Sequence, residues 1–121
     1  TDMLQFEKEN IPTEYFDKII GDVPCSGSGT WYRTPENFSN FSYQTVADYT
    51  TRQKSIIKNA LPFLKPAGDF YYLTCSVFES ENTELKNWIT EQLDLKVIEE
   101  VFFDGMPHGA DAMYMVHLKR A

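Results

Sequence analysis

The chain has 121 residues and a mass of 14.0 kDa, with 42% hydrophobic and 15% aromatic residues, which allows one folded domain and excludes a disordered tail. Its formal net charge of −7 argues against unaided binding to a phosphate backbone, because that affinity comes largely from Lys and Arg. No apolar run approaches the roughly 20 residues that a membrane-spanning helix needs, so we expect a soluble chain.

The termini and cysteines indicate where the protein works. The first ten residues have no basic start and no long apolar segment, so they do not resemble a secretion signal. Cys25 and Cys75 are too few and too far apart for a disulfide framework, which favours a reducing compartment, and we expect the cytoplasm. Because residue 1 is not Met, we expect the chain to be part of a longer protein.

The first half of the chain predicts a strand, a loop and a helix. Residues 16–23 are a short apolar run, typical of a buried strand. Residues 24–42 are rich in Gly, Ser, Pro and Asn, which predicts a loop long enough to be functional. From Thr45, apolar residues recur every three or four positions, as in an amphipathic helix that Pro62 kinks or ends and that closes by residue 68.

The second half predicts a strand at 69–77, a helix at 80–93, and two further strands at 95–103 and 112–120. Alternating strands and helices indicate parallel strands joined by right-handed crossovers. The last connection is too short for a crossover, so the last two strands should be antiparallel. The predicted fold class is therefore α/β, with parallel strands and a final antiparallel strand.

Two cysteines follow two of the predicted strands. Asp22 and Cys25 stand at the carboxyl end of the first, and Cys75 stands at that of the second. Ligands of open α/β sheets bind in the crevice outside these ends. If the strands are neighbours, roughly 5 Å apart, both thiols face one crevice beside a carboxylate. A thiol there can act as a nucleophile once ionised, although a single cysteine at a strand end is more often part of the core.

Other sites fit these residues less well. A tyrosine-phosphatase loop needs an arginine close behind its cysteine, and the nearest here is Arg33. A zinc site made of the cysteines with His108 and His117 lacks a closely spaced pair of ligands, so we expect no metal. The glycines of PCSGSGT match neither a P-loop nor a dinucleotide fingerprint.

The motifs resemble those of a known family. The chain carries DVPCSGSGT followed by an arginine, then RQKSIIKNALPFLKPAG, then YLTCSVFESEN. It thereby resembles the RNA cytosine-5 methyltransferases of the Sun/nucleolar-protein family, with their Asp-x-Pro-Cys-Ser-Gly and Thr-Cys-Ser motifs, the latter followed by Glu-Asn. The closing HGADAMYMVHLKR is similar to a Gly-x-Asp-Gly-Phe-Phe segment of that family, from which it departs at Ala112, Met113 and Tyr114 without affecting a catalytic residue. The resemblance covers nearly the whole chain.

The resemblance implies a fold, a cofactor and a reaction. It implies that residues 1–121 are the C-terminal half of a Rossmann-like, S-adenosylmethionine-dependent methyltransferase domain. In this family a thiolate adds to carbon 6 of cytosine, so that carbon 5 becomes nucleophilic enough to take the methyl group. The nucleophile would be Cys75, and Cys25 would be needed to release the product. Asp22 would hydrogen-bond the cytosine edge and border the cofactor.

Further residues have weaker expected roles. Pro24 and Thr74, beside the two cysteines, are expected to contact substrate. Arg33 is expected to meet a phosphate or Asp22, or equally to be a solvated loop residue. Asp2 is a possible remnant of the cofactor contact near the adenine, or equally a plain terminal residue.

Three polar residues near the motifs have structural interpretations. Gln53 is expected to be a surface helix residue. Glu81 and Asn82 are expected to cap and orient the helix that follows Cys75.

The substrate and the missing parts follow from the same resemblance. The target base must leave its stack, so single-stranded or flipped RNA is expected, ribosomal or transfer RNA, bound largely by regions outside this chain. The glycine-rich cofactor loop is expected before residue 1, so the 121 residues alone should be weakly active or inactive. Alternatives are a non-catalytic RNA-binding or scaffold domain, disfavoured by the intact cysteines, and an unrelated cysteine hydrolase, disfavoured because no histidine is placed as a base.

Overall fold

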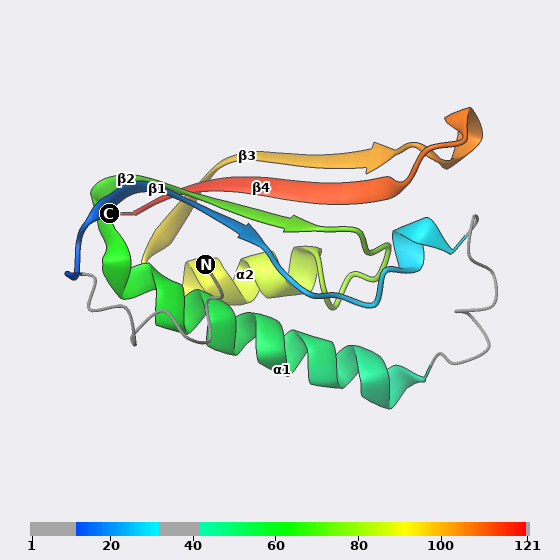
Figure 1. Cartoon of the computed structure of the whole chain (residues 1–121), viewed down its shortest axis with the longest axis horizontal. Helices are drawn as coiled ribbons and strands as arrows, with labels where there is room; N and C mark the ends of the chain where they lie inside the picture. The colour runs from blue at the N-terminus through cyan, green and yellow to red at the C-terminus, as the bar shows by residue number, and fades with distance from the viewer. Residues whose placement is uncertain (1–11, 32–41, 121) are drawn as a thin grey trace.

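The structure is a computed structural model that describes residues 12–31 and 42–120. Its regular elements, shown in Figure 1, are β1 (Phe16–Asp22), α1 (Tyr43–Ala60), β2 (Leu64–Thr74), α2 (Thr83–Gln92), β3 (Leu95–Asp104) and β4 (Ala112–Arg120). The predicted order of strands and helices is confirmed.

The described strands form one sheet in the order β1-β2-β4-β3. β1 pairs parallel to β2, while β4 pairs antiparallel to both β2 and β3. The α/β fold class, with a final antiparallel strand, is therefore confirmed. The sequence did not predict that β4 would lie between β2 and β3, because that pairing joins segments distant in the chain.

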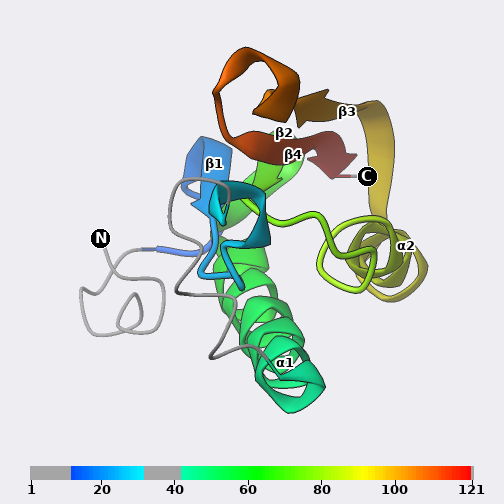
Figure 2. The ribbon, with the colours of Figure 1, turned by 90° about the vertical axis from the view of Figure 1, so that its right-hand side faces the viewer.

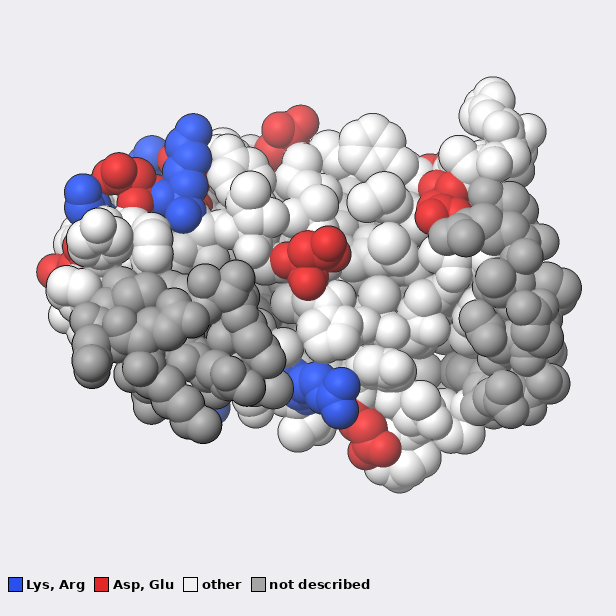
Figure 3. Space-filling model, in the orientation of Figure 1, with Lys and Arg blue, Asp and Glu red and all other residues white. Residues whose placement is uncertain are grey.

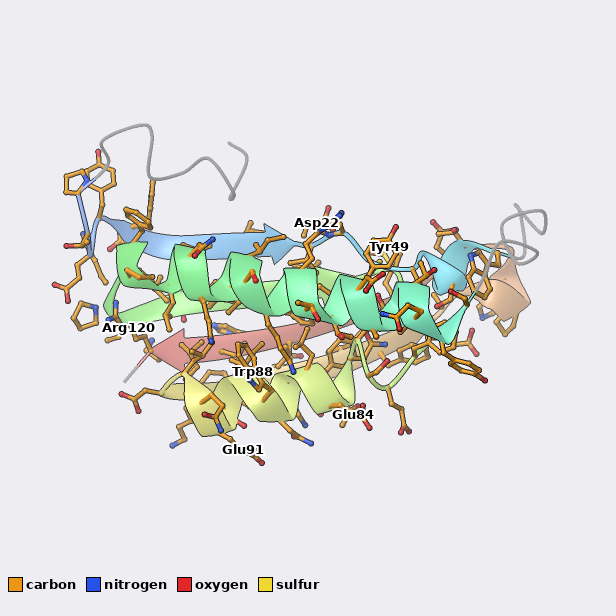
Figure 4. All side chains as sticks on the ribbon, turned by 90° about the horizontal axis from the view of Figure 1, so that it is seen from below. Asp22, Tyr49, Glu84, Trp88, Glu91 and Arg120 are labelled. Atoms are coloured by element: carbon orange, nitrogen blue, oxygen red, sulfur yellow. The ribbon has the colours of Figure 1, made fainter. Side chains whose placement is uncertain are left out.

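Both helices cover the same face of the sheet, as the end-on view in Figure 2 shows. Alternate side chains of a strand point to opposite faces, and those on the helix side form the core. Apolar residues exposed to 1% or less include Ile57, Leu64, Phe70, Tyr72, Leu85, Ile89, Val116 and Leu118. Trp88 of α2 joins the two helices, because the ammonium groups of Lys54 and Lys58 lie 5.3 and 5.6 Å from its ring centre (Figure 4).

The opposite face of the sheet carries apolar side chains that no described helix covers. Strand alternation places Ile20, Leu73, Met115 and Phe103 on this face. Ile20 is 68% exposed and Phe103 is 56% exposed. The described fold is thus one sheet with a single helical layer.

The helix boundaries differ from the predicted ones for local reasons. α1 begins at Tyr43, before Thr45, because the Ser42 side chain accepts a hydrogen bond from the Thr45 amide at 3.1 Å. It ends at Ala60, as the prediction that Pro62 kinks or ends the helix allowed, and Pro62 lies in a 3₁₀ turn that leads directly into β2, which begins at Leu64 instead of residue 69.

The β3–β4 pair contains a titratable contact that predicts a pH dependence. The Tyr114 hydroxyl donates to Glu100, whose carboxylate also lies 3.2 Å from the Lys86 ammonium of α2. The Tyr114 hydrogen bond, with help from Lys86, holds the pKa of Glu100 below its ordinary value. A lowered folded-state pKa stabilises the fold above the ordinary glutamate pKa, and this contribution is lost as the pH falls through the folded value.

We therefore expect Tyr114→Phe to cost more stability near neutral pH than in acid. Denaturant unfolding of both forms between about pH 7 and pH 2 should show the difference between them shrinking below about pH 4.5. Tyr71→Phe is the matched control, because Tyr71 stacks on His117 through its ring, which phenylalanine retains. A Tyr114→Phe cost that stays constant with pH would contradict this assignment.

Candidate functional site

The two cysteine loops leave the same edge of the sheet. β1 and β2 are adjacent and parallel, with Asp22 opposite Leu73, and the Val23 amide continues the pairing by donating to the Leu73 carbonyl at 3.3 Å. The carboxyl ends of adjacent parallel strands are where open α/β sheets bind ligands. The two strands are neighbours, which was the condition for both cysteines to lie at one crevice.

The backbone at one cysteine contacts the thiol of the other. The Cys75 amide donates to Cys25 Sγ at 3.4 Å, and the Cys75 carbonyl accepts from the Gly29 amide at 2.8 Å. Both cysteines are half-buried. The loops that carry these two cysteines, fifty positions apart in the chain, thus meet at one place.

Cys25 lies in surroundings that disfavour its ionised form. Burial raises the pKa of the Cys25 thiol, and the charge of Glu81 adds to the rise, while the amides of Cys75 and Gly27 offset part of it. A thiol with a raised pKa keeps its proton at neutral pH and is a weaker nucleophile for that reason. These surroundings therefore favour the protonated form of the Cys25 thiol.

A buried carboxylate lies beneath the two loops. Glu81 is 0% exposed, and its Oε2 accepts from the Ser26 amide at 2.9 Å and from Gln53 Nε2 at 3.0 Å. Its Oε1 accepts from the Ser76 hydroxyl at 2.6 Å. Ser26 and Ser76 directly follow the two cysteines. The expected capping role of Glu81 is wrong, because its carboxylate binds the cysteine loops instead.

Gln53 is buried, so its expected place on the surface is wrong. The side chain is 0% exposed and donates to the Pro24 carbonyl at 2.9 Å as well as to Glu81. Its carbonyl oxygen accepts from the Tyr72 hydroxyl at 3.3 Å. The sequence contained a signal for this, since Gln53 stands within the repeating apolar stripe of α1.

Asn82 supports the Cys75 loop rather than capping α2. It occupies the N-cap position, but its side chain makes no capping hydrogen bond. Instead it accepts from the Thr74 hydroxyl at 2.6 Å and donates to the Ser76 carbonyl at 2.8 Å. The cap prediction is wrong here, because the buried polar groups of this loop need partners more than the helix end does.

Three serine hydroxyls join the two loops. Ser26, Ser28 and Ser76 lie 3.1 to 3.4 Å from one another through their oxygen atoms. The Ser28 hydroxyl also accepts from the Val77 amide at 2.9 Å. The sequence predicted no role for these three serines, although Ser26 and Ser76 each directly follow a cysteine. Together they tie the Cys25 loop to the Cys75 loop.

The other predicted site residues are placed as follows. Asp22 is exposed at the carboxyl end of β1 (Figure 4). Pro24 is exposed and its carbonyl is bound by Gln53, while the Thr74 side chain is fully buried beneath Cys75. Arg33 and Asp2 lie outside the described residues. The roles expected for these residues in binding substrate or cofactor stay predictions.

The remaining surface gives little sign of a ligand. Among the described residues, no group of three or more His, Cys, Asp or Glu could hold a metal ion. On the face drawn in Figure 3, the described Lys and Arg form no continuous patch. A pocket of about 420 Å³ is lined by Val77, Asn82, Phe102 and Tyr114 among others, but not by the cysteines. No described helix is long and apolar enough to cross a membrane.

Gly29 is required by the close approach of the loops. A Cβ at this position would lie 2.3 Å from the Ala112 carbonyl oxygen and 2.8 Å from that of Cys75, and both are backbone atoms that cannot rotate away. We expect Gly29→Ala to destabilise the fold by about 3 kcal/mol or more, the upper end of the usual cost of overpacking, because both clashing atoms belong to the backbone.

Urea unfolding measures this cost, and Gly109→Ala is the control. Gly109 has open space around it and a φ of +73°, so alanine there costs only the backbone term of about 1–2 kcal/mol. Equal costs at the two positions would mean that the loops are not in the described contact.

Residues 1–119 match the model of the family described as "16S rRNA methyltransferase RsmB/F", and the chain belongs to that family. It is 37% identical over 79 residues to ribosomal RNA small subunit methyltransferase F of Pectobacterium atrosepticum, covering 65% of this chain and 16% of that protein. It is 32% identical over 99 residues to the protein of the same name from Cronobacter sakazakii, covering 82% and 20%. The chain therefore spans about a fifth or less of the curated relatives it matches.

Solved structures share the fold. A methyltransferase homolog from Pyrococcus horikoshii superposes with a TM-score of 0.82 at 20% identity, over all of this chain and 43% of that one. NSun6 from Pyrococcus horikoshii, solved with SFG, gives a TM-score of 0.82 at 19% identity, over 99% of this chain and 33% of that one.

Proposed function

We propose that the protein methylates carbon 5 of cytosine in RNA, with S-adenosylmethionine as methyl donor and a covalent cysteine adduct as intermediate. Membership of a 16S rRNA methyltransferase family supports ribosomal RNA as the substrate class over transfer RNA. The observation that carries the proposal is the contact of the Cys75 amide with Cys25 Sγ at the carboxyl edge of two adjacent parallel strands. A reaction that uses two thiols in turn needs them at one place.

Each cysteine has a separate step in this reaction. The Cys75 thiolate forms a bond to carbon 6 of cytosine, which makes carbon 5 nucleophilic. S-adenosylmethionine, when bound, supplies the methyl group that carbon 5 takes up. The proton on carbon 5 then passes to a solvent water, its electron pair restores the double bond between carbons 5 and 6, and Cys75 leaves carbon 6 as a thiolate. Cys25 assists this release. The raised pKa of Cys25 supports the assignment, because it disfavours Cys25 as the first nucleophile.

Asp22 is the carboxylate best placed to assist. It is exposed at the end of β1, the strand that leads into the Cys25 loop. A carboxylate there can accept hydrogen bonds from the amino edge of a cytosine, or from the cofactor, and stabilise charge that develops on the ring. Asp2 is proposed as a further cofactor contact, and Arg33, Pro24 and Thr74 as substrate contacts. Among the described residues, Asp22 is the one carboxylate proposed to contact the cofactor. We therefore propose that these residues form only part of a larger cofactor site.

The charge of the chain limits how it holds RNA. With a net charge of −7 it cannot supply the counterion release that drives most binding to phosphate backbones. We propose that it presents the reacting groups to an unstacked base, while basic surfaces outside these 121 residues hold the RNA.

Trapping with 5-fluorocytosine tests the proposal. Fluorine on carbon 5 cannot leave as the proton does, so the bond to the cysteine should persist. The longest natural form of the protein, incubated with S-adenosylmethionine and ribosomal RNA that carries 5-fluorocytosine, should give a denaturant-resistant complex. RNA binding without such a complex would reject the enzyme and favour a non-catalytic RNA-binding or scaffold domain.

A further inference from the structure

The two oxygens of one buried carboxylate are divided between the two cysteine loops. Glu81 Oε2 holds the amide of Ser26, at 2.9 Å, and Oε1 holds the hydroxyl of Ser76, at 2.6 Å. We propose that Glu81 is a positioning residue, which sets the separation of the Cys25 and Cys75 thiols by fixing the residue that follows each. The consequence for catalysis rests on the proposed function, but the positioning itself does not.

The geometry leaves the loops little freedom to shift. Glu81, Gln53 and Ser76 are all 0% exposed, so water cannot replace a lost partner. Every buried side-chain nitrogen or oxygen in the described residues has a hydrogen-bond partner. A buried donor that loses its acceptor keeps its full desolvation cost, so the Ser26 amide and the Ser76 hydroxyl are both held to the carboxylate.

The carboxylate is itself fixed from two sides. Gln53 of α1 donates to its Oε2 at 3.0 Å, and the Tyr72 hydroxyl of β2 donates to the Glu81 backbone carbonyl at 2.6 Å. Figure 4 shows α1 lying over the sheet to which β2 belongs. Glu81 therefore fixes both cysteine loops relative to α1 and β2. The two loops meet at the contact between the Cys75 amide and Cys25 Sγ.

Side-chain length, more than charge, should matter for this role. Aspartate is one methylene shorter than glutamate, so Glu81→Asp cannot reach both loops at once. Glutamine keeps the length, and its amide can accept from Ser26 while donating to the Ser76 hydroxyl, which is able to accept. Glu81→Gln should therefore preserve the thiol separation, whereas Glu81→Asp should not.

Phenylarsine oxide measures the separation directly, because it binds tightly only where two thiols can bond to one arsenic atom with loss of water. The longest natural form of the protein should bind it, and Cys25→Ala and Cys75→Ala define the share of binding that belongs to this pair. We expect Glu81→Asp to weaken the pair's affinity by about 10-fold or more, in the range that misplacement of groups by about 1 Å produces. Glu81→Gln should stay within about 3-fold of the parent protein.

The controls keep the outcome clear. Glu84→Asp makes the same change at an exposed position in the first turn of α2 and should leave binding unchanged. If Glu81→Asp does not fold, as judged by circular dichroism, Gln53→Met removes one anchor of the carboxylate and should weaken binding by about 10-fold. Binding by the folded Glu81→Asp, or in its place by Gln53→Met, that matches the parent protein would overturn the proposal.

This test is independent of methyl transfer, since it needs neither RNA nor methyl donor. If the proposed function also holds, Glu81→Asp should lower kcat and leave the KM for RNA within about 2-fold, because it moves the reacting groups and not the RNA-binding surface. Weakened arsenical binding without any methyl transfer in the parent protein would support the positioning role and reject the proposed function.

Discussion

Cys75→Ala is expected to abolish methyl transfer, lowering its rate by on the order of 10⁴-fold or more, as removal of an attacking nucleophile does. Without the thiolate, carbon 5 of cytosine does not become nucleophilic, so binding of RNA and methyl donor cannot compensate. The covalent complex with 5-fluorocytosine RNA should vanish as well. Gel analysis under denaturing conditions, with a parallel methyl-transfer assay, measures both effects.

The loss must come from chemistry and not from unfolding. Cys75 is half-buried, and the contacts of its amide with Cys25 Sγ and of its carbonyl with the Gly29 amide use backbone atoms, which alanine retains. Unfolding curves and RNA affinity should match those of the parent protein. Cys75→Ala protein that still forms the complex would reject Cys75 as the nucleophile.

Cys25→Ala is expected to give the opposite result with ordinary RNA. The attack by Cys75 and the uptake of the methyl group remain possible, but release is impaired, so a covalent complex should accumulate without 5-fluorocytosine. Overall turnover should fall by about 10²-fold or more, the size of effect when a group acting in proton transfer is removed. Denaturing gels of the variant with unmodified RNA and S-adenosylmethionine measure the accumulation.

A double variant is the control for this result. Cys25→Ala with Cys75→Ala should form no complex, because the attacking thiol is gone. If the two single variants behave alike, both losing activity without accumulating a complex, the division of roles between the cysteines is wrong.

The sequence supported the placement of the cysteines because that inference needed few assumptions. Strand–helix alternation implied adjacent parallel strands, and adjacent strands bring the residues after them together. The contact of Cys75 with Cys25 Sγ and the pairing of Asp22 with Leu73 agree with that inference.

The buried polar network around Glu81 could not be predicted from the sequence, for physical reasons. A glutamate just before a helix interacts favourably with the helix dipole, so Glu81 was predicted to be an ordinary residue of the helix start. Its actual partners, Ser26 and Gln53, lie far away in the chain and belong to other elements. The surface position predicted for Gln53 was wrong because a polar residue in an apolar stripe can be buried only if it has hydrogen-bond partners. The sequence does not show which residues those partners would be.

The insertion of β4 between β2 and β3 escaped prediction for a similar reason. The short connection indicated that β3 and β4 pair antiparallel, which is confirmed. Whether β4 also pairs with β2 depends on side-chain packing across the sheet, such as Tyr72 opposite Val116. Period and turn patterns describe single elements and their near neighbours, and not this pairing.

The most direct test is to find which residue carries the base in the trapped complex. Protease digestion of the 5-fluorocytosine complex, followed by tandem mass spectrometry, should place a methylated fluorocytosine nucleotide on the sulfur of Cys75 and leave Cys25 unmodified. A nucleotide on Cys25, or no nucleotide on either cysteine, would contradict the proposed two-thiol reaction.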